Sequence, residues 1–151
     1  MSAIVPIDLE SQLALGRDSP DVCKEVRGRA GVIACDASDR GVYWLVLHPR
    51  RDPAEDYVVR IHWETYPHAP PSVKFATAIG GRLEVTSAWP LISGYRPSSF
   101  DICQPFTREG FALHPEWQTT TERWPVTGNV FLWVAQILQR DLDTRYEGRS
   151  G

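Results

Sequence analysis

The sequence predicts an α+β domain in which a four-stranded antiparallel meander is flanked by helices. Short segments with strand patterns follow one another between residues 32 and 77 through short connections, which favours antiparallel pairing over crossover units. Helical patterns precede and follow this group. Between residues 80 and 125 the periodicity is lost over about 45 residues, which is longer than an ordinary connection and indicates a long, irregular functional region.

The N-terminal part predicts two helices. The first spans residues 7–15 and is stopped by Gly16, because glycine commonly follows the last helical residue. The second begins at Ser19-Pro20-Asp21, a cap residue followed by proline at the first helical position and an acid in the first turn. It ends near residues 28–31, and the side chains that it turns inward are Val22, Cys23 and Val26.

Four segments predict the strands, namely residues 32–35, 42–48, 57–64 and 72–77. The second is an almost continuous apolar run, which suits a strand covered on both faces. In the third, successive side chains alternate between two faces, and one face carries Tyr57, Val59, Ile61 and Trp63. The fourth strand places Val73 and Phe75 on one face.

The irregular region is rich in aromatic side chains, which we expect to pack on the sheet as an apolar cover: Trp89, Tyr95, Phe100, Phe106, Phe111 and Trp117. Asn129 then caps a final helix. The inward stripe of this helix is Val130, Val134, Ile137 and Leu138. The tail, residues 146–151, is expected to be frayed.

The composition indicates one soluble domain, residues 1–151, with 42% apolar residues and a net charge of −3. Mild acidity argues against a nucleic-acid partner bound through a basic face. The apolar runs are too short to span a bilayer, and residues 1–7 lack the features of a secretory signal, so we expect no membrane. Three cysteines without metal-ligand spacing favour a reducing cytoplasm.

One motif joins the third and fourth strands. The sequence Tyr66-Pro67-His68-Ala69-Pro70-Pro71 follows an alternating strand and leads into Val73 and Phe75. Prolines on both sides of a two-residue gap fix φ and disfavour helix, so the link is a stiff bend. This arrangement resembles the ubiquitin-conjugating enzyme (E2) family, with Tyr-Pro-x-x-Pro-Pro and x-Val-x-Phe in register. The resemblance implies a UBC-like fold and a cis Tyr66–Pro67 bond.

Two later segments extend the resemblance over roughly residues 41–142. Asp101-Ile102-Cys103 resembles the Ile-Cys step of the family, and Trp124-Pro125 with the helix at 130–142 resembles its Trp-Pro element and following helix. The resemblance implies that Cys103 accepts a ubiquitin-like protein from an E1-like activating enzyme as a thioester. It further implies transfer to an amine of a protein substrate, with no metal or organic cofactor.

The chain departs from the family pattern around the cysteine. The usual His-Pro-Asn is missing, and residues 93–99 read Ser-Gly-Tyr-Arg-Pro-Ser-Ser. The asparagine that would stabilise the oxyanion is therefore absent. Cys103 and Trp124 are 21 residues apart, which is longer than the usual pattern. The chain looks like a divergent member, similar to bacterial E2-like proteins that have their own ubiquitin-like and activating partners.

Acyl transfer requires a reachable thiolate, a donor for the oxyanion and a way to deprotonate the amine. Cys103 lies in a Pro- and Ser-rich segment that suits an exposed thiol, whereas Cys23 and Cys35 lie in apolar patterns and are expected to be buried. His114 follows Cys103 by 11 residues and is a candidate oxyanion donor or base, or else a surface histidine beside Trp117. Asp101 shares a face with Cys103 if the segment is extended.

Three alternatives stay open. The missing His-Pro-Asn favours an inactive E2-variant module that binds a ubiquitin-like protein or a pathway partner. A cysteine hydrolase using Cys103, His114 and an acid is a second possibility, but such cysteines usually begin a helix, and no helical pattern follows Cys103. A zinc site at Cys103 and His114 lacks paired ligand spacing.

Overall fold

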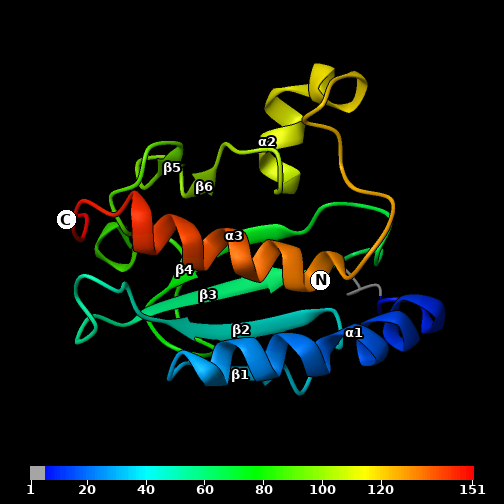
Figure 1. Ribbon diagram of the computed structural model, residues 1–151, viewed down its shortest axis with the longest axis horizontal. Coiled ribbons are helices and arrows are strands. Elements are labelled where there is room, and N and C mark those ends of the chain that lie inside the picture. The colour runs from blue at the N-terminus through cyan, green and yellow to red at the C-terminus, as the bar shows by residue number, and fades with distance from the viewer. Residues whose placement is uncertain (1–5) are drawn as a thin grey trace, which may run out of the picture.

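The computed structural model describes residues 6–151 and has an α+β architecture (Figure 1). The elements in order are α1 (Leu9–Gly28), β1 (Val32–Cys35), β2 (Val42–Leu47), β3 (Tyr57–His62), β4 (Ser72–Ala76), η1 (Thr86–Ala88), β5 (Tyr95–Arg96), β6 (Asp101–Ile102), α2 (Arg108–Leu113), η2 (Pro115–Thr119) and α3 (Val130–Thr144). The first four strands form one antiparallel sheet in the order β1-β2-β3-β4, which confirms the predicted meander.

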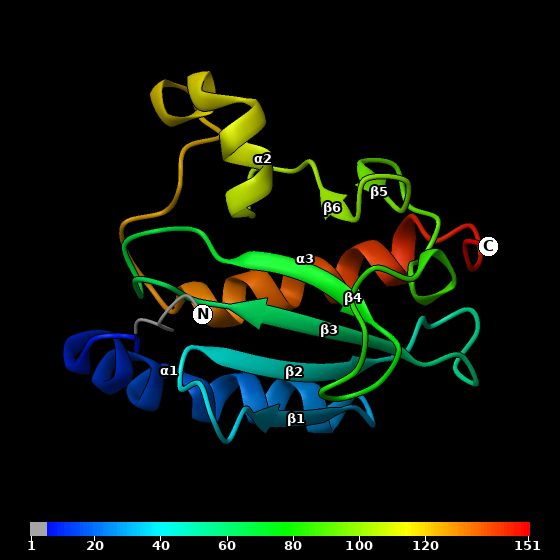
Figure 2. The ribbon, with the colours of Figure 1, turned by 180° about the vertical axis from the view of Figure 1, so that it is seen from behind.

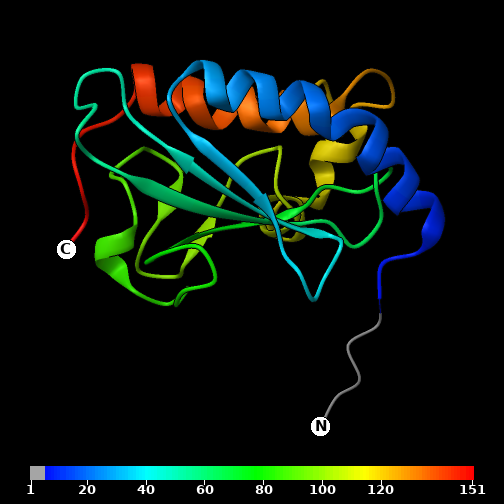
Figure 3. The same ribbon diagram turned by 90° about the horizontal axis from the view of Figure 1, so that it is seen from below.

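Helices α1 and α3 lie side by side on one face of the sheet (Figure 3). The inward faces of β3 and β4 meet them, and the four predicted β3 side chains, Tyr57, Val59, Ile61 and Trp63, are fully buried there. Val73 and Phe75 of β4 are buried on the same side, as predicted. A smaller apolar cluster on the other face includes Val42, Trp44, Val58 and Ala76, so β2 is covered on both faces.

The N-terminal region forms a single helix, so the prediction of two helices separated at Gly16 is wrong. The buried residues of α1 are spaced as one uninterrupted helical stripe, Ser11, Leu15, Asp18, Val22 and Val26. Two members of that stripe are polar, which concealed it in the sequence. Both bind Tyr66: the Tyr66 amide donates to Ser11 Oγ at 3.0 Å, and its hydroxyl donates to Asp18 Oδ2 at 2.5 Å. The helix continues through Pro20, and these two bonds join it to the bend at Tyr66.

The Tyr66–Pro67 peptide bond is cis, as the motif implied. The aromatic cover of residues 89–117 is confirmed as well. Trp89, Tyr95, Phe106 and Phe111 are buried in the main core, and Phe100 and Trp117 pack against it. The irregular region is therefore held down on the sheet by its own aromatic side chains.

Asn129 caps α3 as predicted, since its Oδ1 accepts a hydrogen bond from the Leu132 amide at 2.9 Å. The prediction that the tail is frayed is wrong. Tyr146 is buried with its hydroxyl 2.7 Å from that of Tyr57, and Arg149 lies over the Tyr57 ring and donates to the Asp56 carbonyl oxygen at 2.8 Å. The aromatic and guanidinium groups of the tail therefore tie it to the core.

No helix among residues 6–151 has the length and apolar character that crossing a bilayer needs. The expectation about a secretory signal concerns residues 1–7, of which residues 1–5 lie outside the part of the chain that the structure describes.

Candidate functional site

Cys103 lies directly after a small hairpin at the β4 edge of the molecule (Figure 2). In this hairpin Tyr95 pairs with Ile102 and Arg96 pairs with Asp101. The Cys103 amide continues the ladder by donating to the Gly94 carbonyl oxygen at 2.8 Å. Tyr95 and Ile102 are buried, so the alternate side chains of Arg96, Asp101 and Cys103 share the outward face. The sulfur-bearing residue is half-buried rather than enclosed in the core.

Hydrogen bonds join the buried side of the hairpin to α3. The Tyr95 hydroxyl donates to Asp141 Oδ2 at 2.7 Å, and these residues are only 5% and 1% exposed. Burial is the main cause that raises the pKa of Tyr95 well above its usual value, so the hydroxyl remains a donor. On the same side, Arg145 donates to the Ser93 carbonyl oxygen at 3.0 Å. These contacts fix the strand that precedes the cysteine.

The residue after the cysteine is enclosed by two glycines. A Cβ atom at Gly94, where φ is +89°, would collide with the Gln104 side chain, and one at Gly110 would collide with the Gln104 backbone. Thr107 adds a hydrogen bond from its hydroxyl to the Ile102 carbonyl oxygen at 2.6 Å. The backbone on both sides of Cys103 is thus held by close packing.

Asp101 lies on the same side as Cys103, as the sequence suggested, but it is engaged by a partner. The Arg96 guanidinium donates two hydrogen bonds to the two carboxylate oxygens, each at 2.7 Å. The side chains are 40% and 15% exposed. The bond to Asp101 is the first cause that raises the pKa of Arg96, and the nearby Cys103 side chain acts in the same direction.

Sequence reasoning missed Arg96. Residues 93–99 lack the family's His-Pro-Asn, and two-residue strands carry too little periodicity to show a cross-strand pair. The available signal was an arginine and an aspartate five residues apart around Pro97-Ser98-Ser99, which is a spacing that a hairpin closes.

His114 lies at the C-terminal end of α2, where its ring stacks on Trp117 with 4.3 Å between centroids. Its Nδ1 is 2.9 Å from Glu116 Oε1, and this hydrogen bond is the main cause that lowers the pKa of Glu116. Among the described residues, no hydrogen bond or ring contact joins His114 to Cys103. The structure therefore shows His114 in a surface stack.

The other two cysteines differ from expectation. Cys35 is exposed and Cys23 is half-buried, so the prediction that both are small buried hydrophobes is wrong. Cys35 is the last residue of β1, an edge strand with only one neighbour in the sheet. Edge position, which the apolar pattern does not reveal, explains its exposure.

A cleft of about 260 Å³ opens beside the residues that follow Cys103. Gln104 and Phe106 form one wall, and Trp133, Ile137 and Arg145 around α3 form the other.

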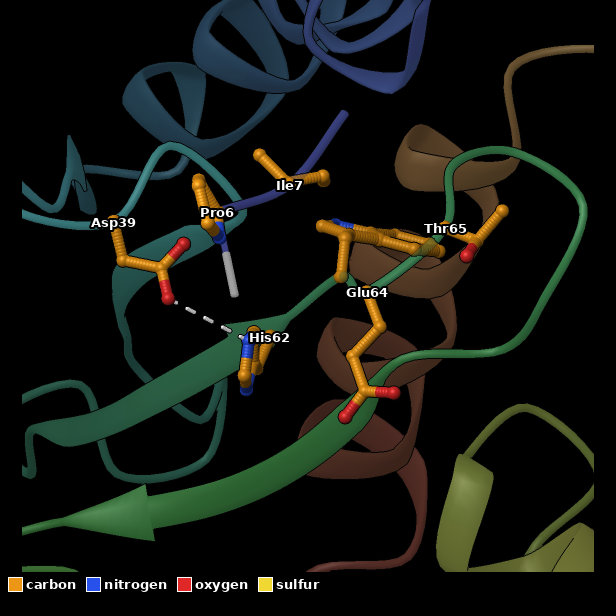
Figure 4. Close-up of a pocket in the computed structure, with 7 residues that line it drawn as sticks. Pro6, Ile7, Asp39, His62, Glu64 and Thr65 are labelled. Carbon is orange, nitrogen blue, oxygen red and sulfur yellow. Dashed lines mark ion pairs between the residues drawn. The ribbon is translucent and has the colours of Figure 1, made fainter. Parts of the chain in front are cut away.

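A second hollow, of about 490 Å³, lies at the end of β3 (Figure 4). His62 Nε2 faces Asp39 Oδ2 across it at 3.7 Å, with Glu64 and Thr65 on its rim. Burial lowers the pKa of His62, and the charge of Asp39 opposes that shift in part. None of Cys103, Asp101 and His114 lines this hollow.

Within residues 6–151 no group of three or more His, Cys, Asp or Glu side chains is arranged to hold a metal ion. Comparison of the chain with protein-family models, with curated proteins and with solved structures found no match.

Proposed function

We propose that the protein is an E2-like conjugating enzyme of UBC-like fold that carries a ubiquitin-like protein as a thioester on Cys103. The observation that carries the proposal is the position of this cysteine. It is half-buried on the outward face of an anchored hairpin, and the residue after it, Gln104, lines a cleft. The four-stranded meander supports the same interpretation.

The proposed reaction begins when the Cys103 thiolate takes the acyl group from an E1-like enzyme. An amine of a protein substrate then attacks the thioester carbonyl carbon, and the sulfur leaves as thiolate. Asp101 lies on the same side as the sulfur and is placed to attract the amine, while it also holds Arg96. The proposal assigns no step to His114, because its described contacts are with Trp117 and Glu116.

The N-terminal end of α1 offers a surface for the activating enzyme. Leu9 and Leu13 lie one turn apart and are 68% and 67% exposed. Leu13 borders a hollow of about 350 Å³ that Pro67 and His68 complete. Exposed leucines on one helical face are typical of a docking site for another protein. The reaction, with its free thiols, belongs in the cytoplasm.

The test is charging with a ubiquitin-like protein, an activating enzyme and ATP. The expected product is a covalent adduct on a non-reducing gel that dithiothreitol removes. Cys103→Ala abolishes it, Cys103→Ser converts it into an adduct that resists dithiothreitol, and Cys35→Ala, the matched control, leaves it unchanged. An adduct that persists in Cys103→Ala contradicts the proposal.

An inactive E2-variant module is the second candidate. The observation that favours it is the engagement of Asp101 by Arg96 together with the location of His114 in a surface stack. Its signature in the same assay is a non-covalent complex with the ubiquitin-like protein and no adduct that dithiothreitol removes.

A further inference from the structure

Arg96 places a cation on the face of the hairpin that carries Cys103. Arg96 lies opposite Asp101 in the ladder, and Gly94 lies opposite Cys103. Arg96 and Cys103 are therefore diagonal neighbours on one face of the hairpin, at a spacing that a long side chain can bridge. Gly94 contributes no side chain, and the Gln104 carboxamide packs against it.

We propose that Arg96 is the catalytic group that stabilises negative charge at the site, first on the Cys103 thiolate and then on the oxyanion of the acyl group. This inference rests on the proposed function for the oxyanion step. The thiolate step concerns the chain alone.

The Arg96 guanidinium has N–H groups that Asp101 does not use. Its Nε and one terminal nitrogen donate to Asp101, each at 2.7 Å. Its other terminal nitrogen has no hydrogen-bond partner within residues 6–151. A guanidinium carries five N–H groups in a rigid plane, so an arginine fixed on one edge by a carboxylate presents the remaining edge in a defined direction. Asp101 thus acts as a positioning residue for Arg96.

The charges balance through the transfer step. The amine nitrogen attacks the thioester carbonyl carbon, so a C–N bond forms and the carbonyl oxygen becomes an oxyanion. When this intermediate collapses, the C–S bond breaks and Cys103 leaves as thiolate, while the amine proton passes to water. A fixed cation lowers the free energy of both anions, the oxyanion and the departing thiolate.

The bond to Asp101 is the main cause that raises the pKa of Arg96, and the Cys103 side chain is a smaller one. If Arg96 only held the two strands of the hairpin together, the bidentate pair with Asp101 would be sufficient. The shared outward face and the free edge of the guanidinium leave its remaining donors on the side of the hairpin that carries the sulfur.

The first experiment measures alkylation of Cys103 by iodoacetamide as a function of pH, with exposed Cys35 as the internal reference in the same molecule. Arg96→Gln is expected to slow Cys103 relative to Cys35 by about three- to tenfold at neutral pH, as removal of one nearby, partly exposed charge predicts. It also moves the pH profile of Cys103 upward. Arg96→Lys retains most of the alkylation rate.

If Arg96→Gln leaves the alkylation rate of Cys103 relative to Cys35 unchanged, the inference is overturned. An equal loss of this rate in Arg96→Gln and Arg96→Lys also overturns it, because it would show that Arg96 only holds the hairpin together. Circular dichroism of each variant excludes unfolding as the cause.

The second experiment uses a peptide ending in Gly-Gly as its thioester, loaded on Cys103 and then offered free lysine. Arg96→Gln is expected to slow aminolysis more than Arg96→Lys does, and equal rates overturn the oxyanion step. Because alkylation needs no partner, Arg96-dependent alkylation without charging by an activating enzyme would refute the proposed function and leave the thiolate step standing.

Discussion

The buried bond between Tyr95 and Asp141 yields the sharpest prediction about stability. Tyr95→Phe removes one hydroxyl and changes no other atom. That hydroxyl donates to Asp141 Oδ2 at 2.7 Å in a place where Asp141 is 1% exposed. Because Asp141 is almost inaccessible to solvent, water cannot replace the lost donor, and Asp141 Oδ2 is left without this hydrogen bond.

The expected cost follows from the charge of the acceptor. A hydrogen bond to a charged group contributes about 1.5–3 kcal/mol to the free energy of unfolding, against about 0.5–1.5 kcal/mol for a neutral pair. A guanidinium nitrogen of Arg145 lies 3.5 Å from Asp141 Oδ1, and one of Arg140 lies 3.7 Å from it, so the charge of Asp141 stays partly compensated. We therefore expect a loss of about 2 kcal/mol.

Urea denaturation followed by tryptophan fluorescence measures this loss. Tyr57→Phe is the matched control, because it removes a hydroxyl from an equally buried tyrosine whose partner, the Tyr146 hydroxyl, is neutral. The midpoint of Tyr95→Phe should fall further than that of Tyr57→Phe, with the denaturant slope unchanged in both. A loss below about 0.5 kcal/mol, or one no greater than that of Tyr57→Phe, would refute the reasoning.

Three further changes test other parts of the structure. Asn129→Ala removes the cap of α3 and should cost about 1 kcal/mol in the free energy of unfolding, whereas Asn129→Ser should cost less; equal losses would contradict the capping role. Because burial holds the pKa of His62 below its unfolded value, the unfolded chain binds the proton more readily. Stability should be full above that unfolded value, about 6.5, and decline as pH falls below it. His62→Gln should flatten this decline, and an unchanged pH profile of the melting temperature would rule out His62 as its source. Tyr66→Phe removes the donor to Asp18 and should lower the melting temperature more than Ser11→Ala, since only the first leaves a buried carboxylate short of a donor.

The sheet could be predicted from the sequence because its apolar pattern was complete. In β3 every inward position is Tyr, Val or Ile, and Trp63 directly after it continues the pattern, so period-two alternation was visible without tertiary information. The α3 cap was visible for a similar reason: Asn129 acts within its own first turn. Local interactions of this kind are encoded by neighbouring residues.

The errors arose where distant partners decide the structure. Gly16 and Pro20 are strong local signals for a break, but α1 is continuous, and Tyr66 binds its Ser11 and Asp18 from 55 and 48 residues away. The tail is ordered through Tyr57 and Asp56, about 90 residues earlier in the chain. Neither contact has a signature in the local pattern.

The candidate site was predictable in part. The motif drew attention to Cys103, and alternation placed Asp101 on its side. The pairing of Asp101 with Arg96 required the hairpin register, which two-residue strands do not encode. Exposure of Cys35 required knowledge that β1 is an edge strand.

Competition between two thiols of one chain tests the central claim most directly. The chain is mixed with a limiting amount of a Gly-Gly peptide thioester, quenched at short times, and mapped by mass spectrometry of its proteolytic peptides. Our account predicts that the acyl group is found on Cys103 before Cys35, although Cys35 is the more exposed of the two. Acylation of Cys35 at an equal or greater rate would contradict the claim that the hairpin prepares Cys103 for acyl transfer.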